Sequence, residues 1–387
     1  MSGLPIYMDY CATTPCDPRV LQAMLPYFSD HFGNPASHAH PYGWMAREAV
    51  QMAREQTAAL LEAEPSEIVF TSGATEAINL AVKGVYDAYR SKGKHLVTCQ
   101  TEHQAVLDCC KSLEKDGADV TVLPVGPDGQ LDPERFRNSL RPDTVLAAVM
   151  LANNETGLIH PVSTLASIAK ERGVLFFCDA TQAVGKIPVS VRNLRVDLLA
   201  CSAHKFYGPK GTGALFIRRR QPRVRLSPQL EGGGQENGLR SGTLNVPGIV
   251  GLGAACSLAA EQMTADADRL SLLRNRLEEV LFGLFSIQVH CSQQPRLPHV
   301  SNVCLEDASG AAAIASLRKR MAISFGSACH SRQHAPSHVL LAMGVPPQQA
   351  LQSVRFSLGR PFTEDAFRQV CEDLEACANN PDWGVVR

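Results

Sequence analysis

The sequence predicts an α/β protein with a large domain, built on a mainly parallel seven-stranded sheet flanked by helices, and a smaller α+β C-terminal domain. Seven apolar runs of strand length lie between residues 67 and 218 and alternate with segments of helical pattern. The runs are continuously apolar, which is typical of parallel strands covered on both faces. They are EIVFTSG, HLVTC, DVTVLPV, TVLAAVML, VLFFCDA, DLLACSA and GALFIR.

The segments between these runs fit crossover helices, which parallel strands require. Helical spacing is also clear in AREAVQMAREQTAALL, just before the first run, which predicts an amphipathic helix with one buried stripe. The stripe consists of Ala46, Ala49, Val50, Ala53, Thr57, Leu60 and Leu61.

The pattern of the chain changes after about residue 258. A long helical pattern, RLSLLRNRLEEVLFGLF, precedes shorter strand candidates and a closing helix. We therefore expect a large domain over residues 16–257 and a small domain over residues 1–15 and 258–387. Ligands of α/β sheets bind beyond the carboxyl ends of the strands, so the polar residues after the apolar runs carry the functional information.

Composition limits the functional classes. The chain has 387 residues, of which 45% are apolar, and its 37 Lys and Arg nearly cancel its 38 Asp and Glu. No long-range field therefore favours nucleic acid, an anionic membrane or acidic ligands. The run RRRQPRVR at 218–225 is a local exception, which we interpret as a solvated loop in preference to a docking site for an acidic partner.

The N-terminal and cysteine patterns predict a cytoplasmic protein. MSGLPIYMDYCATTP lacks a basic start followed by a long apolar segment, and no uncharged apolar stretch approaches the length of a membrane span. Thirteen cysteines occur without a CxxC pair, which argues against a disulfide framework and a zinc module. We expect most of them to be reduced and buried, with no bound metal.

The stretch FTSGATEA ends a strand near Thr71 and opens a helix near Ala74. Small side chains let the backbone approach an anion, and free amides at a helix start favour a phosphate. Gly73, Ala74 and Thr75 are therefore candidate phosphate ligands. Thr-Ser-Gly before a helix is more often only a cap and a turn, so this motif alone does not decide between the two interpretations.

The stretch VLFFCDATQ places a carboxylate, Asp179, at the end of a buried strand. An ionised carboxylate there needs a cation or several donors, and a protonated ligand nitrogen would serve. Gln182 lies three residues further on and would turn its amide toward the same ligand. A simple helix cap is an equally good interpretation of Asp179.

The stretch DLLACSAHKFYGPKGTG ends another buried strand with Ser202, His204 and Lys205. A poorly hydrated lysine amine at such a junction is a usable nucleophile. Lys210 competes for this role, but it lies in a GPKGTG turn that should be exposed, so we favour Lys205.

A phosphate loop, a carboxylate after one strand and a lysine after a later strand together suit pyridoxal 5′-phosphate. The phosphate anchors the cofactor, the carboxylate keeps the pyridine nitrogen protonated, and the lysine forms a Schiff base. The sequence therefore predicts a cofactor-dependent enzyme.

Ten stretches in order make the sequence resemble the NifS/IscS-type cysteine desulfurases, which belong to the class V aminotransferase group and have the fold type I architecture of pyridoxal-phosphate enzymes. They run from residue 8 to residue 360, nearly the whole chain. They are MDYCATTP, FGNPAS, TSGATEAINLAVKG, TEHQAVL, ANNETG, DATQAVGK, SAHKFYGPKGTGALF, GGGQENGLRSGT, GSACHS and SVRFSLGR.

The resemblance implies a role for each cofactor-binding residue. Lys205 is the Schiff-base lysine and moves the proton on the substrate α-carbon. His103, which would otherwise be interpreted as a polar loop histidine, stacks on the cofactor ring. Asp179 pairs with the pyridine nitrogen and Gln182 with the ring hydroxyl. The phosphate ligands implied are Ala74, Thr75, Ser202 and His204, with Thr243 contributed by the other subunit of a homodimer.

The resemblance also implies the substrate and sulfur sites. Asn154 and Arg355 bind L-cysteine, and the planar guanidinium suits a bidentate contact with its carboxylate. Cys329 is the sulfur acceptor, because a thiolate must attack the substrate sulfur and leave with a persulfide. A Gly- and Ser-rich loop suits a thiol that carries sulfur from the cofactor to the surface. His330 beside it is best interpreted as a solvated loop histidine.

Three positions and the C-terminus depart from the family pattern. Cys11 replaces a small residue, and Gln235 and Asn237 vary the GGGHERG pattern; we expect none of them to touch the catalytic residues. The chain ends at EACANNPDWGVVR, without the longer tail of members that dock an iron–sulfur scaffold protein. The identity of the sulfur-acceptor protein therefore stays open, with such a scaffold as one candidate.

The function implied is conversion of L-cysteine to L-alanine with transfer of sulfur to Cys329. A selenocysteine lyase on the same fold is the nearest alternative. A class V aminotransferase is less favoured because it has no use for a mobile thiol. A non-catalytic sulfur-relay module is disfavoured because Lys205, Asp179 and His103 are all present.

Overall fold

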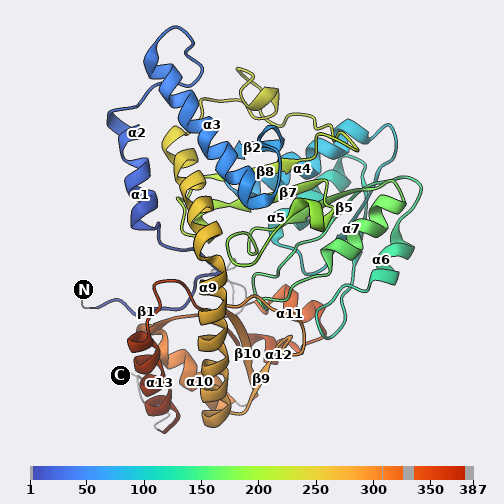
Figure 1. The fold of residues 1–387 in the computed structure, drawn as a ribbon. Helices are drawn as coiled ribbons and strands as arrows, with labels where there is room; N and C mark the ends of the chain where they lie inside the picture. Colours follow the sequence, from blue (N-terminus) through green and yellow to red (C-terminus); the bar gives the residue numbers. More distant parts are fainter. Residues whose placement is uncertain (1–2, 307, 326–334, 380–387) are drawn as a thin grey trace.

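The computed structural model describes residues 3–306, 308–325 and 335–379. Its main element is a seven-stranded sheet in the order β2-β8-β7-β6-β5-β3-β4 (Figure 1). Only β8 is antiparallel to its neighbours; the other pairs are parallel. Each predicted apolar run forms one strand, which confirms the predicted sheet. The strands are β2 (Ile68–Thr71), β3 (His95–Cys99), β4 (Asp119–Leu123), β5 (Thr144–Ala148), β6 (Leu175–Asp179), β7 (Leu198–Ser202) and β8 (Gly213–Ile217).

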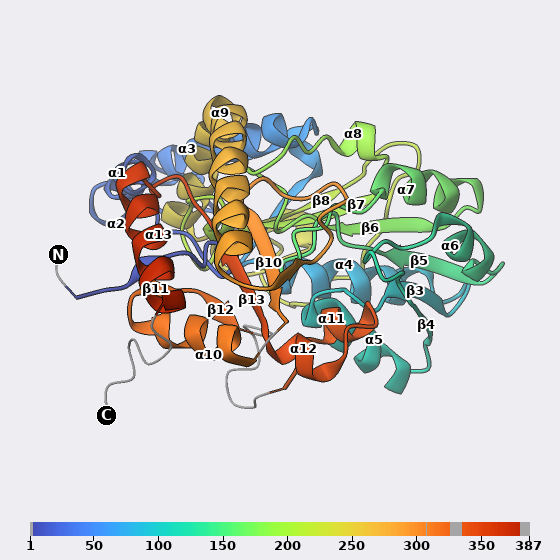
Figure 2. The same cartoon turned by 90° about the horizontal axis from the view of Figure 1, so that it is seen from below.

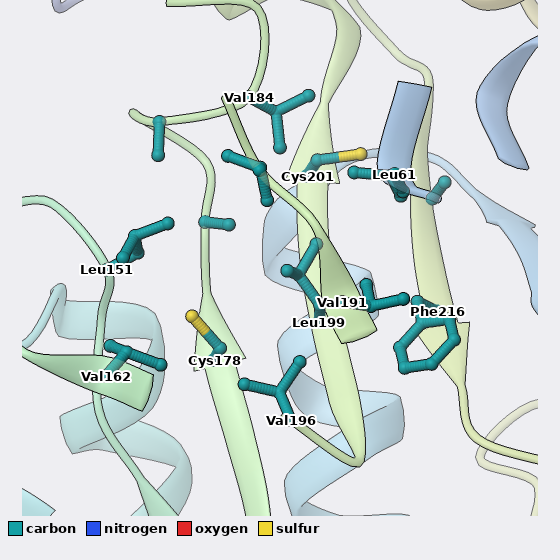
Figure 3. Packing of buried hydrophobic residues seen from close by; sticks show 14 of the residues in the cluster. Leu61, Leu151, Val162, Cys178, Val184, Val191, Val196, Leu199, Cys201 and Phe216 are labelled. Atoms are coloured by element: carbon teal, nitrogen blue, oxygen red, sulfur yellow. The ribbon is translucent and has the colours of Figure 1, made fainter. Parts of the chain in front are cut away.

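Helices cover both faces of this sheet, as the continuously apolar strands require. Successive residues of β6 alternate between the two layers: Phe177 packs with the first helical layer, and Phe176 and Cys178 pack with the second. Figure 3 shows Leu199 of β7 between Cys178 of β6 and Phe216 of β8 in the second layer. The first layer contains α4 (Ala74–Tyr89) and α5 (Gln104–Lys115); the second contains α3 (Pro41–Leu61), α6 (Pro133–Ser139), α7 (Val162–Glu171) and the first part of α9 (Val246–Leu284).

The predicted stripe of α3 is confirmed. Six of its seven residues are buried, and Leu60 is half-buried against the same core. The helix ends at Leu61 and is capped by Glu62, which adopts a left-handed conformation with φ of 54°.

Helix α9 has 39 residues and extends well before the predicted helical pattern. The Gly-rich segment GIVGLGAACSLAA is helical because its small residues allow close approach to α3. A Cβ on Gly253 would lie 2.6 Å from the Cα of Ala53. Residues up to Ala259 pack in the core of the sheet domain, and residues from Leu270 onward pack in a second core. The helix thus passes unbroken through residue 257, and the domain boundary stays a prediction.

The second core lies around a four-stranded antiparallel sheet in the order β12-β13-β10-β9. Figure 2 shows α10 and α13 beside α9, far from β4 at the other side of the molecule. The N-terminal β1 (Ile6–Tyr7) pairs in parallel with β11 (Met321–Ala322) and so joins this part of the molecule. The remaining elements here are β9 (Ile287–Val289), β10 (Val300–Leu305), β12 (Ser324–Phe325), β13 (Ser353–Ser357), α10 (Ala308–Ser316), α11 (His338–Ala342), α12 (Pro347–Leu351) and α13 (Glu364–Asn379).

Three further short helices are α1 (Pro18–Met24), α2 (Pro26–Ser29) and α8 (Val191–Leu194). Over the described ranges, no helix combines the length and apolar character needed to cross a membrane.

Candidate active site

The carboxyl ends of six strands meet at one edge of the large sheet, because all strands except β8 run in the same direction. Loops after five of them line one pocket of about 400 Å³. Topology therefore brings together residues as far apart in sequence as Ser72 and Gly211. The predicted residues in its lining are Gly73, Ala74, Thr75, His103, Asn154, Asp179, Gln182, Ser202, His204 and Lys205.

The start of α4 supplies the anion-binding part of this pocket. Its N-cap is Gly73, which has a φ of 152° and makes no side-chain capping hydrogen bond. The first amides of the helix are therefore available to a ligand. Gly213 permits this placement, since a Cβ there would lie 2.7 Å from the Cα of Gly73. Ser202 is adjacent, because a Cβ on Gly73 would lie 3.7 Å from its hydroxyl oxygen.

Asp179 is the buried carboxylate of the site, with 5% of its surface exposed. Its Oδ1 accepts hydrogen bonds from the main-chain N–H of Thr181 at 2.9 Å and from the Thr181 hydroxyl at 2.5 Å. This local turn accounts for one carboxylate oxygen only. The two interpretations of Asp179, as a helix cap and as a ligand contact, are therefore compatible with each other.

Two lysines line the pocket, and they differ in environment. Lys205 is half-buried, and its Nζ donates to the main-chain oxygens of Cys11 at 2.6 Å and Ala12 at 2.9 Å. Lys210 is exposed, as its turn predicted. Burial and these two hydrogen bonds give the Lys205 amine a defined position in the pocket, which favours it over the exposed Lys210 as the candidate nucleophile.

The expectation that Cys11 does not touch the catalytic residues is wrong. Its main-chain oxygen accepts hydrogen bonds from both Lys205 Nζ and Gln182 Nε2, the latter at 3.0 Å. Because both hydrogen bonds are made by the main-chain oxygen, the type of side chain at position 11 gives no indication of them in the sequence. Gln235 and Asn237, by contrast, are absent from the pocket lining as described.

His103 is the N-cap of α5, and its Nδ1 accepts a hydrogen bond from the Ala105 N–H at 3.1 Å. Burial lowers the pKa of His103, with Lys205 and His338 acting in the same direction and Asp179 opposing them. The neutral ring is thereby favoured, and with Nδ1 as acceptor its proton lies on Nε2.

His204 lines the pocket two residues after Ser202. Its Nδ1 lies 3.0 Å from the Thr13 hydroxyl oxygen. Burial, together with Lys205 and Lys210, lowers the pKa of His204 to about 4. A neutral imidazole there acts toward an anion as a hydrogen-bond donor, without a full charge.

Arg355 projects from β13 and is 4% exposed. Its Nη1 donates to the main-chain oxygen of Asn154 at 2.7 Å, and its Nη2 lies 2.5 Å from Oδ1 of Asp9. Asn154 lines the pocket, whereas Arg355 contacts Asn154 but is not itself part of the described lining. The two residues predicted to bind substrate are therefore in direct contact.

Two predicted site residues remain. Thr243 is exposed and does not line the pocket of its own chain. Cys329 falls in 326–334, outside the described residues.

Sequence analysis missed Glu102, which is fully buried next to His103. Its Oε1 accepts a hydrogen bond from the Met150 N–H at 2.6 Å, and its Oε2 has no partner among the residues that the structure describes. Burial raises the pKa of Glu102 well above its usual value, and the charge of Asp179 adds to this effect. Its position directly after the strand in HLVTCQTEH was the available signal.

A family model decides the relationship of the chain to known proteins. The model described as "Aminotransferase class-V" matches residues 6–369. The chain belongs to the class-V aminotransferase family.

The chain is also similar to individual known proteins. A protein named "Cysteine desulfurase IscS" from Anaeromyxobacter dehalogenans is 54% identical over 363 residues, which cover 94% of this chain and 89% of the relative. A solved structure titled "NIFS-LIKE PROTEIN" has a TM-score of 0.89 and 36% identity, covering 97% of this chain and all of that one. A second, titled "SspA in complex with cysteine", has a TM-score of 0.83 and 37% identity, covering 91% of this chain and 98% of that one.

Class-V aminotransferases are pyridoxal-phosphate enzymes, and the donor set of this chain fits that group. The cofactor carries an anion at one end, a basic ring nitrogen at the other and an aldehyde between them. The pocket offers the uncapped start of α4, the carboxylate of Asp179 and the amine of Lys205. Each polar feature of the cofactor thus has a complementary group.

Proposed function

We propose that this protein is a pyridoxal-phosphate-dependent cysteine desulfurase, which converts L-cysteine to L-alanine and transfers the sulfur to Cys329 as a persulfide. The observation that carries the proposal is the single pocket that collects an uncapped helix start, a buried carboxylate and a half-buried lysine. The 54% identity to a cysteine desulfurase over 94% of the chain supports the choice of substrate and favours it over selenocysteine.

The cofactor-binding residues are assigned by their chemistry. When bound, the cofactor supplies an electron sink that stabilises negative charge at the substrate α-carbon. The amides of Ala74 and Thr75, with the side chains of Ser202 and His204, hold its phosphate. Asp179 keeps its ring nitrogen protonated.

Gln182 would contact the ring hydroxyl of the cofactor, and His103 would lie against its ring. Gln182 has one amide hydrogen directed to Cys11, which fixes the orientation of its carboxamide. The neutral ring of His103 carries its proton on Nε2, where it acts as a hydrogen-bond donor.

Lys205 holds the cofactor covalently and moves the α-proton of the substrate. Its Nζ lies between the main-chain oxygens of Cys11 and Ala12. These acceptors give the amine a defined position when it carries the proton that it has removed, so the proton stays within the site.

Asn154 and Arg355 bind the substrate. Their direct contact places a guanidinium next to a pocket-lining residue, where the carboxylate of an amino acid would arrive.

Cys329 accepts the sulfur. Its thiolate attacks the substrate sulfur, the Cβ–S bond breaks, and the bonding electrons stay on the carbon skeleton, which is protonated to alanine. The persulfide then passes to an acceptor protein, of which an iron–sulfur scaffold is the first to test.

A homodimer completes the site. Thr243 is exposed in its own chain, which suits a role in the pocket of a second copy. Large apolar side chains are exposed along α1, α2 and α3, which lie together in Figure 1, and a second copy would cover them. They are Leu21, Leu25, Phe28, Phe32, Tyr42, Trp44, Met45 and Met52.

Mass spectrometry after a brief exposure of the holoenzyme to L-cysteine tests the proposal. We expect one added sulfur atom on the peptide that contains Cys329, together with L-alanine in solution. Cys329→Ser should still bind the cofactor but carry no added sulfur. Alanine release by Cys329→Ser at the normal rate without added thiol would show that the acceptor is wrong, and absence of alanine from the wild type would refute the activity.

A further inference from the structure

The guanidinium of Arg355 already forms an ion pair with a carboxylate of the protein itself, that of Asp9. Oδ1 of Asp9 lies 2.5 Å from Nη2 of the guanidinium, and the Asp9 side chain is 21% exposed against 4% for Arg355. The main-chain oxygen of Asn154 takes Nη1, while Nε is buried without a partner among the described residues. A ligand carboxylate that approaches this guanidinium therefore meets a second negative charge.

We propose that Asp9 is a specificity-determining residue, which weakens binding of the substrate carboxylate at Arg355. This inference rests on the proposed function, in which Arg355 binds that carboxylate. Two carboxylates on one guanidinium lie within several ångströms of each other, and their repulsion is strong in a site that is largely shielded from water. Asp9 also pairs with Nη2 of Arg355 before substrate arrives, so the ligand gains less by pairing with the guanidinium.

Asp9 is suited to this role because its backbone is held independently of its carboxylate. The Tyr7 hydroxyl donates to its main-chain oxygen at 3.0 Å, and the residue forms a parallel bridge with Ser357. A change of the side chain should therefore leave the segment in place. The amide oxygen of Asn is able to accept the same hydrogen bond from Nη2, so Asp9→Asn removes the charge and retains the geometry.

The test compares wild-type, Asp9→Asn and Asp9→Glu holoenzymes with two probes that differ only in the carboxylate. L-Alanine carries the carboxylate and ethylamine lacks it; binding of each is followed by the absorption of the cofactor. We expect Asp9→Asn to lower the Kd of L-alanine about 10-fold and to leave the Kd of ethylamine unchanged. Asp9→Glu keeps the charge and should stay near wild type. The KM of L-cysteine should fall in parallel with the Kd of L-alanine.

An unchanged or higher Kd of L-alanine in Asp9→Asn overturns the proposal, since that result would mean that Asp9 only positions Arg355. Equal tightening of ethylamine overturns it as well, because the effect would then not act through the carboxylate. Failure of the wild type to form alanine from L-cysteine refutes the proposed function instead. Because this last measurement is separate from the two Kd values, the two failures are distinguishable.

Discussion

The two halves of the site are built in different ways. The half proposed to bind the cofactor consists of residues at or just after the ends of neighbouring strands: Asp179 ends β6 and Ser202 ends β7. The substrate half is assembled from segments that lie 201 and 346 residues apart, which are the separations of Arg355 from Asn154 and from Asp9. Strand topology is sufficient for the first half, whereas the second exists only after two separate cores have packed together.

The N-terminal segment connects these halves. The main-chain oxygens of Cys11 and Ala12 accept hydrogen bonds from Lys205 in the cofactor half. Asp9, two residues earlier, contacts Arg355 in the substrate half. Substitutions should therefore separate into effects on the cofactor and effects on the substrate, according to the half in which they lie.

The largest effect is expected at Lys205. Lys205→Ala should lower kcat for alanine formation by about 10⁴-fold, because it removes both the covalent hold and the proton transfer. Amino-acid analysis of the reaction mixture measures this loss. Lys210→Ala is the matched control, because Lys210 lines the same pocket but is exposed. Its loss should change kcat only about a few-fold, since an exposed charge contributes little. Equal losses in the two variants would contradict the assignment of Lys205.

A substitution in the substrate half should act on KM. Arg355→Lys keeps the charge and loses the planar pair of donors, so the KM of L-cysteine should rise about 10- to 100-fold with a smaller change in kcat. Steady-state kinetics measure the split between the two constants, and the cofactor absorption of the resting enzyme should stay the same. Loss of that absorption would show that the two halves are not separate.

A substitution at Gly213, which packs against Gly73 at the start of α4, should have a moderate effect. In Gly213→Ala the new Cβ would lie 2.6 Å from the oxygen of Cys201 and 2.7 Å from the Cα of Gly73. We expect a loss of about 1–3 kcal/mol in the free energy of unfolding and weaker retention of the cofactor. Gly283→Ala is the control: that position on α9 has open space and should gain about 0.5–1 kcal/mol from helix propensity. Denaturant unfolding of both variants measures these changes in the free energy of unfolding.

The smallest effect concerns pH. Burial lowers the pKa of His160, which is 2% exposed, to about 4. The unfolded chain, with a histidine pKa of about 6.5, binds this proton first, so stability should fall as pH decreases from about 6.5 to 4. His160→Gln should reduce that slope by about 1 kcal/mol per pH unit, measured by urea unfolding across this range. The exposed His38→Gln serves as control, and an equal change there would attribute the slope to another cause.

Much of the cofactor half could be predicted because its signals are local. The approach of the backbone at Gly73 and the carboxylate at the end of β6 both follow directly from residue type and strand position. The substrate half gave no such signal. Asp9 lies in a motif that resembles the family, yet nothing around it in sequence indicates contact with a guanidinium 346 residues away.

By itself the sequence determined the seven strands, the covered faces and the residues at the strand ends, because apolar periodicity and residue type act over short distances along the chain. The tertiary structure alone decided that the carbonyl of Cys11 meets Lys205, that Asp9 pairs with Arg355, and that α9 passes unbroken between two cores. These contacts depend on how distant segments pack, and a backbone carbonyl or a buried ion pair leaves no mark in the local pattern.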